Sequence, residues 1–143
     1  MGTTPTLTHT DTTPIFVYGT LRPDCGNDVL WRGKAHARFD GLAILPRFRL
    51  VSHGAFPFAL PDADADAVGA LIVPNDGEYD EVLARMDRLE GYPRFYDRLM
   101  VAVDTPDGIV KAWVYTPAHP DEYDHLADVP DGDWHNVSRR WRS

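Results

Sequence analysis

The feature that most restricts the fold of this 143-residue chain is one helical pattern set among short β-rich segments. Apolar residues recur at helical spacing from Tyr79 to Glu90, and Gly91 follows as a helix stop. Most other apolar residues fall in short runs of β-branched and aromatic residues that are bounded by Gly, Pro, Asn and Asp. One good helix with several short strands indicates an α+β domain whose sheet can close into a small barrel.

The β-rich runs predict where the strands lie. We expect strands at 15–18, 68–73, 96–104 and 109–116, and two short or bent strands within 34–51. The sequence Thr105-Pro106-Asp107-Gly108 predicts a hairpin turn between the strands at 96–104 and 109–116. Between the strands we expect one helical turn at 27–31, a loop or edge at 53–61, and a solvated turn in the Asp/Ala segment 62–67.

The charge balance excludes two classes of partner. The chain has 22 acidic and 14 basic residues, a formal net charge of −8 with His neutral. Nucleic-acid-binding proteins normally present a basic stripe that replaces the counterions of the phosphates, so we expect no nucleic acid as a partner. An anionic membrane surface is disfavoured for the same reason, and no apolar stretch reaches the length needed to span a bilayer.

The single cysteine and the N-terminal segment bear on compartment and domain organisation. Cys25 has no second cysteine to pair with, which fits a reducing compartment, and we expect a cytoplasmic protein. Residues 1–14 are Thr-rich and lack the basic and apolar regions of a secretory signal. We therefore expect 1–14 to be a disordered tail and 15–143 to be a single domain.

A metal centre and a cysteine nucleophile are the two chemical alternatives that the residue types raise. The ligand types His119, Asp121, Asp124 and His125 lie close together, but within a polar segment broken by Pro, where a solvated loop is the better interpretation. No motif places a histidine beside Cys25. We expect neither a metal nor another cofactor.

Glu90 lies on the wrong face of the predicted helix for a solvated carboxylate. At about 100° per residue it falls inside the apolar arc, close to Leu83 and Met86 in angle. Burial and the negative end of the helix dipole would both raise its pKa toward the value that a general base needs near neutral pH. The alternative is that the helix unwinds at Leu89 and Glu90 points to solvent.

A glycine turn follows the first expected strand. Gly19 within Tyr18-Gly19-Thr20-Leu21-Arg22 permits a positive φ, and successive backbone N–H groups in such a turn can bind an anion or a developing oxyanion. An ordinary turn is the alternative interpretation, because a strand followed by Gly and a loop is common.

Together these stretches resemble the γ-glutamyl cyclotransferase-like family. The residues Tyr18-Gly19-Thr20-Leu21-Arg22 resemble its substrate loop, and Asp87-Arg88-Leu89-Glu90-Gly91-Tyr92, followed by Tyr96-x-Arg98, resembles its catalytic segment. Shorter matches occur in the expected order at Phe56-Pro57, Leu60-Pro61, Val68-Gly69, Trp113-Val114-Tyr115 and Gly132-Asp133-Trp134. The likeness extends from about residue 16 to about residue 134. Within the family, the motif pattern of this sequence is similar to that of γ-glutamylamine cyclotransferases, antibiotic-pathway members and plant avirulence-induced proteins.

The resemblance implies a fold, a reaction and a set of site residues. The fold would be a small mixed β-barrel, closed or nearly closed, with flanking helices. The reaction would release 5-oxoproline from a small-molecule γ-glutamyl substrate, with Glu90 as catalytic acid and base and no cofactor. Substrate contacts are expected from Tyr18, Gly19, Thr20, Leu21, Tyr96 and Tyr115.

Some roles stay open at this point. Tyr96 could orient Glu90 or the substrate, and Tyr115 could line the pocket. A half-buried barrel aromatic is the alternative interpretation of each, and it is favoured slightly for Tyr115. Arg22 could attract a substrate carboxylate or be an exposed loop residue, whereas Arg98 is expected to be a structural ion-pair partner. A non-catalytic ligand-binding or structural member of the same fold is the rival function, and neither the substrate nor the oligomeric state follows from the sequence.

Overall fold

Two 18-residue strands, paired antiparallel over most of their length, form the framework of the fold. The structure is a computed structural model that describes residues 13–23 and 25–136. Its strands are β1 (Ile15–Val17), β2 (Ala35–Ser52), β3 (Pro57–Pro74), β4 (Tyr96–Thr105), β5 (Gly108–Pro117) and β6 (Ala127–Asp128). Its helices are α2 (Tyr79–Glu90) and the short 3-10 turns η1 (Asn27–Leu30), η2 (Pro120–Glu122) and η3 (Pro130–Gly132).

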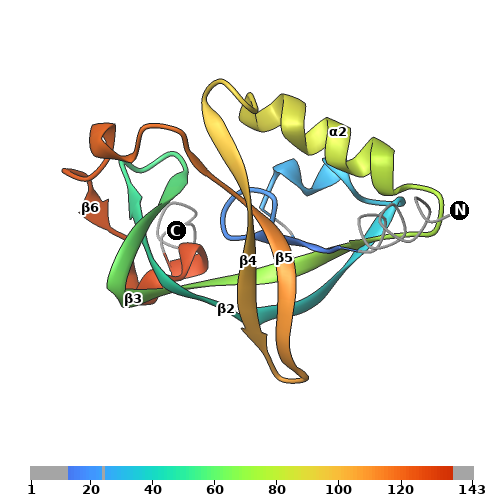
Figure 1. The fold of residues 1–143 in the computed structure, drawn as a ribbon, viewed down its shortest axis with the longest axis horizontal. Coiled ribbons are helices and arrows are strands. Elements are labelled where there is room, and N and C mark those ends of the chain that lie inside the picture. The colour runs from blue at the N-terminus through green and yellow to red at the C-terminus, as the bar shows by residue number, and fades with distance from the viewer. Residues whose placement is uncertain (1–12, 24, 137–143) are drawn as a thin grey trace, which may run out of the picture.

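Five of the strands close into a barrel. They are hydrogen-bonded in the order β3-β1-β5-β4-β2, and β2 pairs back onto β3, which closes the ring, while β6 pairs with the end of β2. The pairing of β1 with β5 is parallel and the other pairings are antiparallel. Figure 1 shows β4 and β5 crossing the front of the barrel. The expected α+β barrel with flanking helices is confirmed.

The segment expected to form two bent strands is one continuous strand, β2. It keeps its pairing with β3 through two irregularities, one between Arg38 and Ala43 and one between Pro46 and Phe48. Positive φ angles at Phe39, Gly41 and Arg47 mark these places. Such bulges bend a strand without ending it, which is how one strand can follow the wall of a small barrel.

The expectation for 53–67 was partly wrong. Residues 53–56 form the expected loop, but 57–67 belong to β3, which pairs with β2 from Pro57 opposite Ser52 to Pro61 opposite Phe48, and again at Asp66 and Ala67. Local composition favours a turn here, but β2 supplies a partner on both sides of 62–65, and this pairing overrides local propensity. Strands β1, β4 and β5, the turn at 27–31, the hairpin and the helix lie where they were expected, within one or two residues, whereas β6 was not expected.

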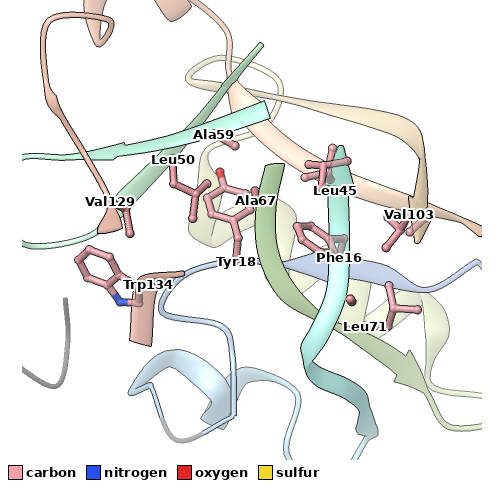
Figure 2. Close-up of a cluster of buried hydrophobic side chains, with 13 residues drawn as sticks. Phe16, Tyr18, Leu45, Leu50, Ala59, Ala67, Leu71, Val103, Val129 and Trp134 are labelled. Carbon is pink, nitrogen blue, oxygen red and sulfur yellow. The ribbon is translucent and has the colours of Figure 1, made fainter. Parts of the chain in front are cut away.

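The core has two main parts, which lie on opposite faces of the barrel wall. Phe16 and Tyr18 point into the barrel, where they pack with residues such as Leu45 and Leu71, and Figure 2 shows Val129 and Trp134 at one end of this cluster. Their neighbours Ile15 and Val17 point outward, as alternation along a strand requires. There they pack with Val82 and Met86, and this contact holds α2 against the barrel (Figure 1).

The described part of the chain begins just before the barrel. The backbone N–H of Trp113 donates to the carbonyl of Pro14 at 2.9 Å, so Pro14 joins the folded part rather than the expected tail. Residues 1–12 of that tail lie outside the described residues. Among the residues that the structure describes, no helix is both long enough and apolar enough to cross a membrane.

Candidate active site

A pocket of about 280 Å³ opens where the end of α2 meets the end of β1. Its walls come from the end of β1 with the loop after it, the start of η1, the β2–β3 connection with the first residue of β3, the last turn of α2, and strands β4 and β5. It is lined by Phe16, Val17, Tyr18, Gly19, Thr20, Leu21, Asn27, Phe56, Pro57, Leu89, Glu90, Tyr96 and Tyr115. All seven residues that the sequence indicated as site residues therefore share one cavity.

Glu90 is the last residue of α2 and lies in the pocket wall. The helix does not unwind before it, because Gly91 ends the helix in the left-handed conformation (φ 73°) and its N–H bonds back to the last turn. Glu90 is half-buried, and this burial raises the pKa of its carboxyl from 4.5 to about 7. The expected apolar face is confirmed by the fully buried Val82 and Met86.

Leu89 departs from the expected helix face. It was placed in the apolar arc, yet 44% of its surface is exposed, because it lies at the margin of the arc. The exposed side chain nevertheless lines the pocket beside Glu90.

The loop after β1 supplies hydrogen-bond donors to the pocket. Within the described part of the chain, the backbone N–H groups of Gly19, Thr20 and Leu21 donate to no protein acceptor. The loop itself is fixed, since Arg22 N–H donates to the carbonyl of Gly19 and the side chain of Asn27 donates to the hydroxyl of Thr20 at 2.8 Å. Free N–H groups on a fixed loop can hold an anion.

The reason for glycine at position 19 differs from the expected one. Gly19 does not have a positive φ. Instead, a β-carbon at this position would lie 2.8 Å from both Cγ and Cδ of Pro57, closer than such contacts occur in proteins. Glycine is required because the β2–β3 connection packs directly on the loop, a contact that no local pattern reveals.

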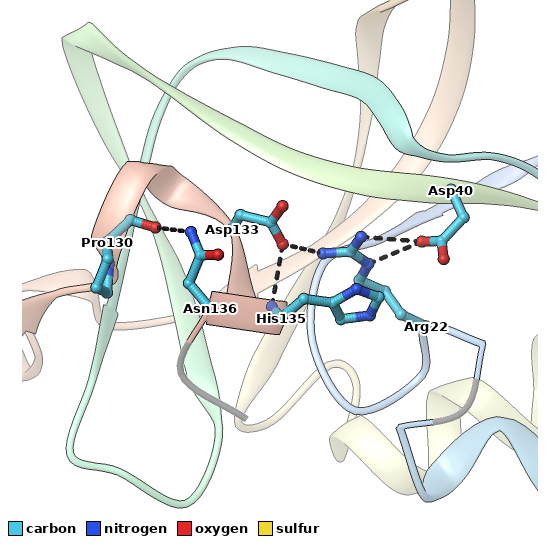
Figure 3. A network of polar contacts seen from close by, with 6 residues as sticks. All are labelled: Arg22, Asp40, Pro130, Asp133, His135 and Asn136. Atoms are coloured by element: carbon cyan, nitrogen blue, oxygen red, sulfur yellow. Dashed lines mark hydrogen bonds and ion pairs between the residues drawn. The ribbon is translucent and has the colours of Figure 1, made fainter. Parts of the chain in front are cut away.

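Arg22 is neither a substrate anchor nor an exposed residue. Its side chain is 1% exposed and lies between two carboxylates, with Nη1 2.6 Å from Asp133 Oδ1 and Nη2 2.9 Å from Asp40 Oδ1 (Figure 3). Burial alone would raise the pKa of Asp133, but the hydrogen bonds and positive charges of Arg22 and His135 together outweigh burial and lower that pKa. This network anchors the end of the substrate loop to β2 and to the segment after η3.

The pocket tyrosines are held by hydrogen bonds. Tyr18 donates its hydroxyl proton to the carbonyl of Tyr115 at 2.6 Å, and the Tyr115 hydroxyl donates to Asp87 at 2.5 Å. Arg98 also donates to Asp87, at 2.6 Å, which confirms the expected ion pair. Burial raises the pKa of Tyr18, Tyr96 and Tyr115, and the nearby charge of Glu90 adds to the effect for Tyr18 and Tyr96.

The structure bears on both chemical alternatives. Among residues 13–23 and 25–136, no group of three or more His, Cys, Asp or Glu side chains is arranged to hold a metal ion. Cys25 is half-buried and packs against the barrel core.

Six wall residues were not indicated by sequence as site residues. Phe56, Pro57 and Leu89 belonged to motifs of the resemblance, so a signal for them existed, whereas Phe16 and Val17 were expected only as strand residues and nothing marked Asn27. The assembled pocket contains one carboxylate whose pKa is raised to about 7 and a loop with unpaired N–H groups.

Comparisons with known proteins point to one family. The family model described as "Gamma-glutamyl cyclotransferase, AIG2-like" matches residues 15–136. The chain is 32% identical to a γ-glutamylaminecyclotransferase of Bos taurus, over 84% of this chain and 75% of that protein. It is similar to the crystal structure of an AIG2-like protein from Mus musculus, with 26% identity and a TM-score of 0.65 over 82% of this chain and 86% of that one.

A further likeness concerns the fold alone. YkqA from Bacillus subtilis superposes with a TM-score of 0.67 at 20% identity, over 92% of this chain. The present chain spans only 42% of the length of YkqA.

Proposed function

The chain belongs to the γ-glutamyl cyclotransferase, AIG2-like family, and we propose that it releases 5-oxoproline from a γ-glutamyl amine or peptide, with Glu90 as the general acid and base. One observation carries the proposal. The half-buried Glu90, with a pKa raised to about 7, shares a pocket with the unpaired N–H groups of the loop at 19–21.

In this proposal the substrate provides its own nucleophile. The α-amino group of a γ-glutamyl compound is mostly an ammonium ion at neutral pH, so it cannot attack until Glu90 removes a proton. The freed amine then closes a five-membered ring on the γ-carbonyl carbon. Such an intramolecular attack needs mainly that the substrate be held in the folded conformation.

Two groups on the protein would assist the breakdown of the tetrahedral intermediate to products. The N–H groups of Gly19, Thr20 and Leu21 are the proposed donors to the tetrahedral oxygen. Glu90 would return its proton to the leaving amine as the bond between the γ-carbon and that nitrogen breaks, and the ionised carboxylate would then take the second proton from the ring nitrogen to leave the N–H of 5-oxoproline. A carboxyl group with a pKa of about 7 suits both transfers, because it is populated in both protonation states near neutral pH.

Tyr18, Tyr96 and Tyr115 are proposed to shape the substrate pocket. Their rings line it, and the hydrogen bonds from Tyr18 to Tyr115 and from Tyr115 to Asp87 fix two of them in place. No step of the proposed reaction passes through a metal or another cofactor.

We also propose the compartment, the class of partner and the domain organisation of the protein. The single cysteine supports a reducing compartment, and we propose the cytoplasm. The net charge of −8 supports a small-molecule partner rather than nucleic acid or a membrane surface. We propose that 15–143 form one domain, a view that the single barrel within 15–136 supports.

The test is to incubate the purified protein with a panel of γ-glutamyl amines, γ-glutamyl dipeptides and glutathione, and to identify the product by mass. We expect 5-oxoproline, and we expect no product when the α-amino group is acetylated. Free glutamate, or cleavage of the acetylated compound, would mean that water is the nucleophile and that the protein is a hydrolase. Binding without turnover by any panel member would make the chain a ligand-binding protein of this fold.

A further inference from the structure

The last turn of α2, which carries Glu90, is not anchored by buried side chains. The buried residues of α2 are Tyr79, Val82 and Met86, and none of the helical residues that follow Met86, all of which the structure describes, is buried. Packing of an apolar face is what normally holds a helix on its domain. In α2 such packing ends at Met86, so the position of Glu90 depends on other contacts.

Asp87 provides hydrogen bonds that tie this turn to the barrel. Its carboxylate accepts a hydrogen bond from Nη1 of Arg98 on β4 at 2.6 Å and another from the hydroxyl of Tyr115 on β5 at 2.5 Å. Asp87 lies three residues before Glu90, so both belong to one turn of the helix. Because β4 and β5 are paired strands, one carboxylate joins the turn that carries Glu90 to two adjacent strands of the wall.

The two donors are themselves held in place. The guanidinium of Arg98 lies over the ring of Tyr92, 4.5 Å from its centroid, and over the ring of Trp113, at 4.9 Å. Tyr115 is 3% exposed. Hydrogen bonds from donors that cannot move away also restrict the movement of their acceptor, which is Asp87.

The same chain of contacts continues to the loop after β1. The carbonyl of Tyr115 accepts a hydrogen bond from the hydroxyl of Tyr18, and Tyr18 directly precedes Gly19. In the proposed reaction the substrate's α-amine meets Glu90 while its γ-carbonyl oxygen meets this loop. The separation of the two groups therefore has to match the folded substrate, and small errors in such a separation cost much of the rate.

We propose that Asp87 is a positioning residue, which holds the Glu90 carboxyl in the pocket wall at the separation from the loop at 19–21 that ring closure requires. The positioning role rests on the proposed function. Asp87 does not line the pocket, and its carboxylate is engaged by Arg98 and Tyr115, so it acts through the position of Glu90 and not on the substrate.

The pKa of Glu90 reports whether this tie holds. Burial raises that pKa to about 7, so a turn that moves away from the barrel would admit water and lower the pKa toward 4.5. Tyr18 and Tyr96 feel the charge of Glu90, and both stay neutral near pH 7 because burial raises their pKa values. No other residue of the described pocket lining is acidic or basic, and the charges of Asp87 and Arg98 outside that lining offset each other.

Tyr115→Phe is the first test, because it removes one hydrogen bond and leaves the ring and the charge of Asp87 in place. The carboxyl carbon of Glu90 is titrated by NMR in ¹³C-labelled protein and assigned with Glu90→Gln. We expect its pKa to fall by at least about one unit relative to the unaltered protein. Tyr123→Phe is the matched control, since Tyr123 stacks on Phe58 outside the pocket lining, and the pKa should not change.

Asp87→Asn is the second variant, in which the amide keeps the shape but loses the charge that strengthens both hydrogen bonds. We expect kcat for 5-oxoproline release to fall about tenfold or more above pH 8, where Glu90 is ionised in every variant, while KM changes less than about threefold. Tyr115→Phe should lower kcat in the same direction. Asp80→Asn removes an exposed carboxylate from the first turn of the same helix and should leave kcat unchanged.

The outcomes separate this inference from the proposed function. An unshifted Glu90 pKa in Tyr115→Phe, or an unchanged kcat above pH 8 in both variants, overturns the positioning role, even where the variants melt at a lower temperature. The release of 5-oxoproline by the unaltered protein would then still stand. If the unaltered protein releases none, the proposed function falls and the role in ring closure falls with it. The NMR titration needs no turnover, so it decides in either case whether Asp87 holds Glu90 in the pocket wall.

Discussion

The guanidinium of Arg22 lies 2.6 Å from the carboxylate of Asp133, a contact across 111 positions of the sequence. Arg22 follows the pocket-lining residues Gly19, Thr20 and Leu21, and Asp133 follows η3 near the end of the described chain. The N–H of His135 also donates to Asp133 at 3.0 Å, so one carboxylate joins the substrate loop to the C-terminal segment (Figure 3).

Replacing Asp133 by Asn should lower the free energy of unfolding by about 2 kcal/mol, because a buried guanidinium then loses a charged hydrogen-bond partner. Urea denaturation measures the change. Asp128→Asn is the control, since the ion pair of Asp128 with Arg49 is largely exposed on the Asp128 side and should contribute less than about 0.5 kcal/mol. Equal effects of the two substitutions would show that the Arg22 network is not a structural anchor.

Gly19→Ala should displace the substrate loop, because the new β-carbon would lie 2.8 Å from the ring of Pro57. We expect a stability loss of about 1–3 kcal/mol and a fall in kcat/KM. Adding Pro57→Ala removes the colliding ring, so the double variant should recover part of both losses. A single variant with normal stability and rate would mean that the loop tolerates the side chain.

Glu90→Gln should leave the fold intact and reduce kcat by about 10²-fold or more, because the amide cannot take up or return a proton. Steady-state assays of 5-oxoproline release measure this. Glu81→Gln is the control on the same helix, where Glu81 pairs with Arg85 away from the pocket, and its rate should match that of the unaltered protein. A folded Glu90→Gln variant with a normal rate would remove Glu90 from the mechanism.

The rate should depend on pH through Glu90. Burial raises the pKa of this carboxyl to about 7, and only the ionised form can accept the proton of the substrate. We expect kcat/KM to rise with pH and to level off above an apparent pKa near 7. A rate that is constant between pH 5 and 8 would contradict the assignment of Glu90 as the general base.

The free energy of unfolding should also depend on the ionisation of Glu90, but it should fall as pH rises, whereas the rate should increase. The carboxyl has a pKa of about 7 when folded and about 4.5 when unfolded, so between these values the folded state binds the extra proton. The stabilising contribution of the protonated Glu90 carboxyl is fully present below pH 4.5 and is lost as pH rises through 7. Relative to the unaltered protein, Glu90→Gln should gain up to about 3 kcal/mol between pH 4.5 and 8, measured by urea denaturation at each pH.

Local patterns in the sequence predicted the elements that are stabilised locally. The helix at Tyr79–Glu90 has the expected ends, because its apolar spacing and Gly91 are properties of neighbouring residues. The β4–β5 hairpin likewise follows from its turn residues. The same periodicity placed Glu90 on the buried side of α2, and the raised pKa follows from that placement.

Contacts between distant segments decided the rest. β3 continues past the Asp/Ala segment because β2 pairs with it on both sides of 62–65, and Gly19 is required because Pro57 packs on it. Arg22 is buried because Asp40 and Asp133 meet it from two other parts of the chain. Contacts of these three kinds (strand pairing, steric contact and ion pairing) depend on which surfaces the closed barrel brings together. Short-range sequence patterns therefore do not predict them.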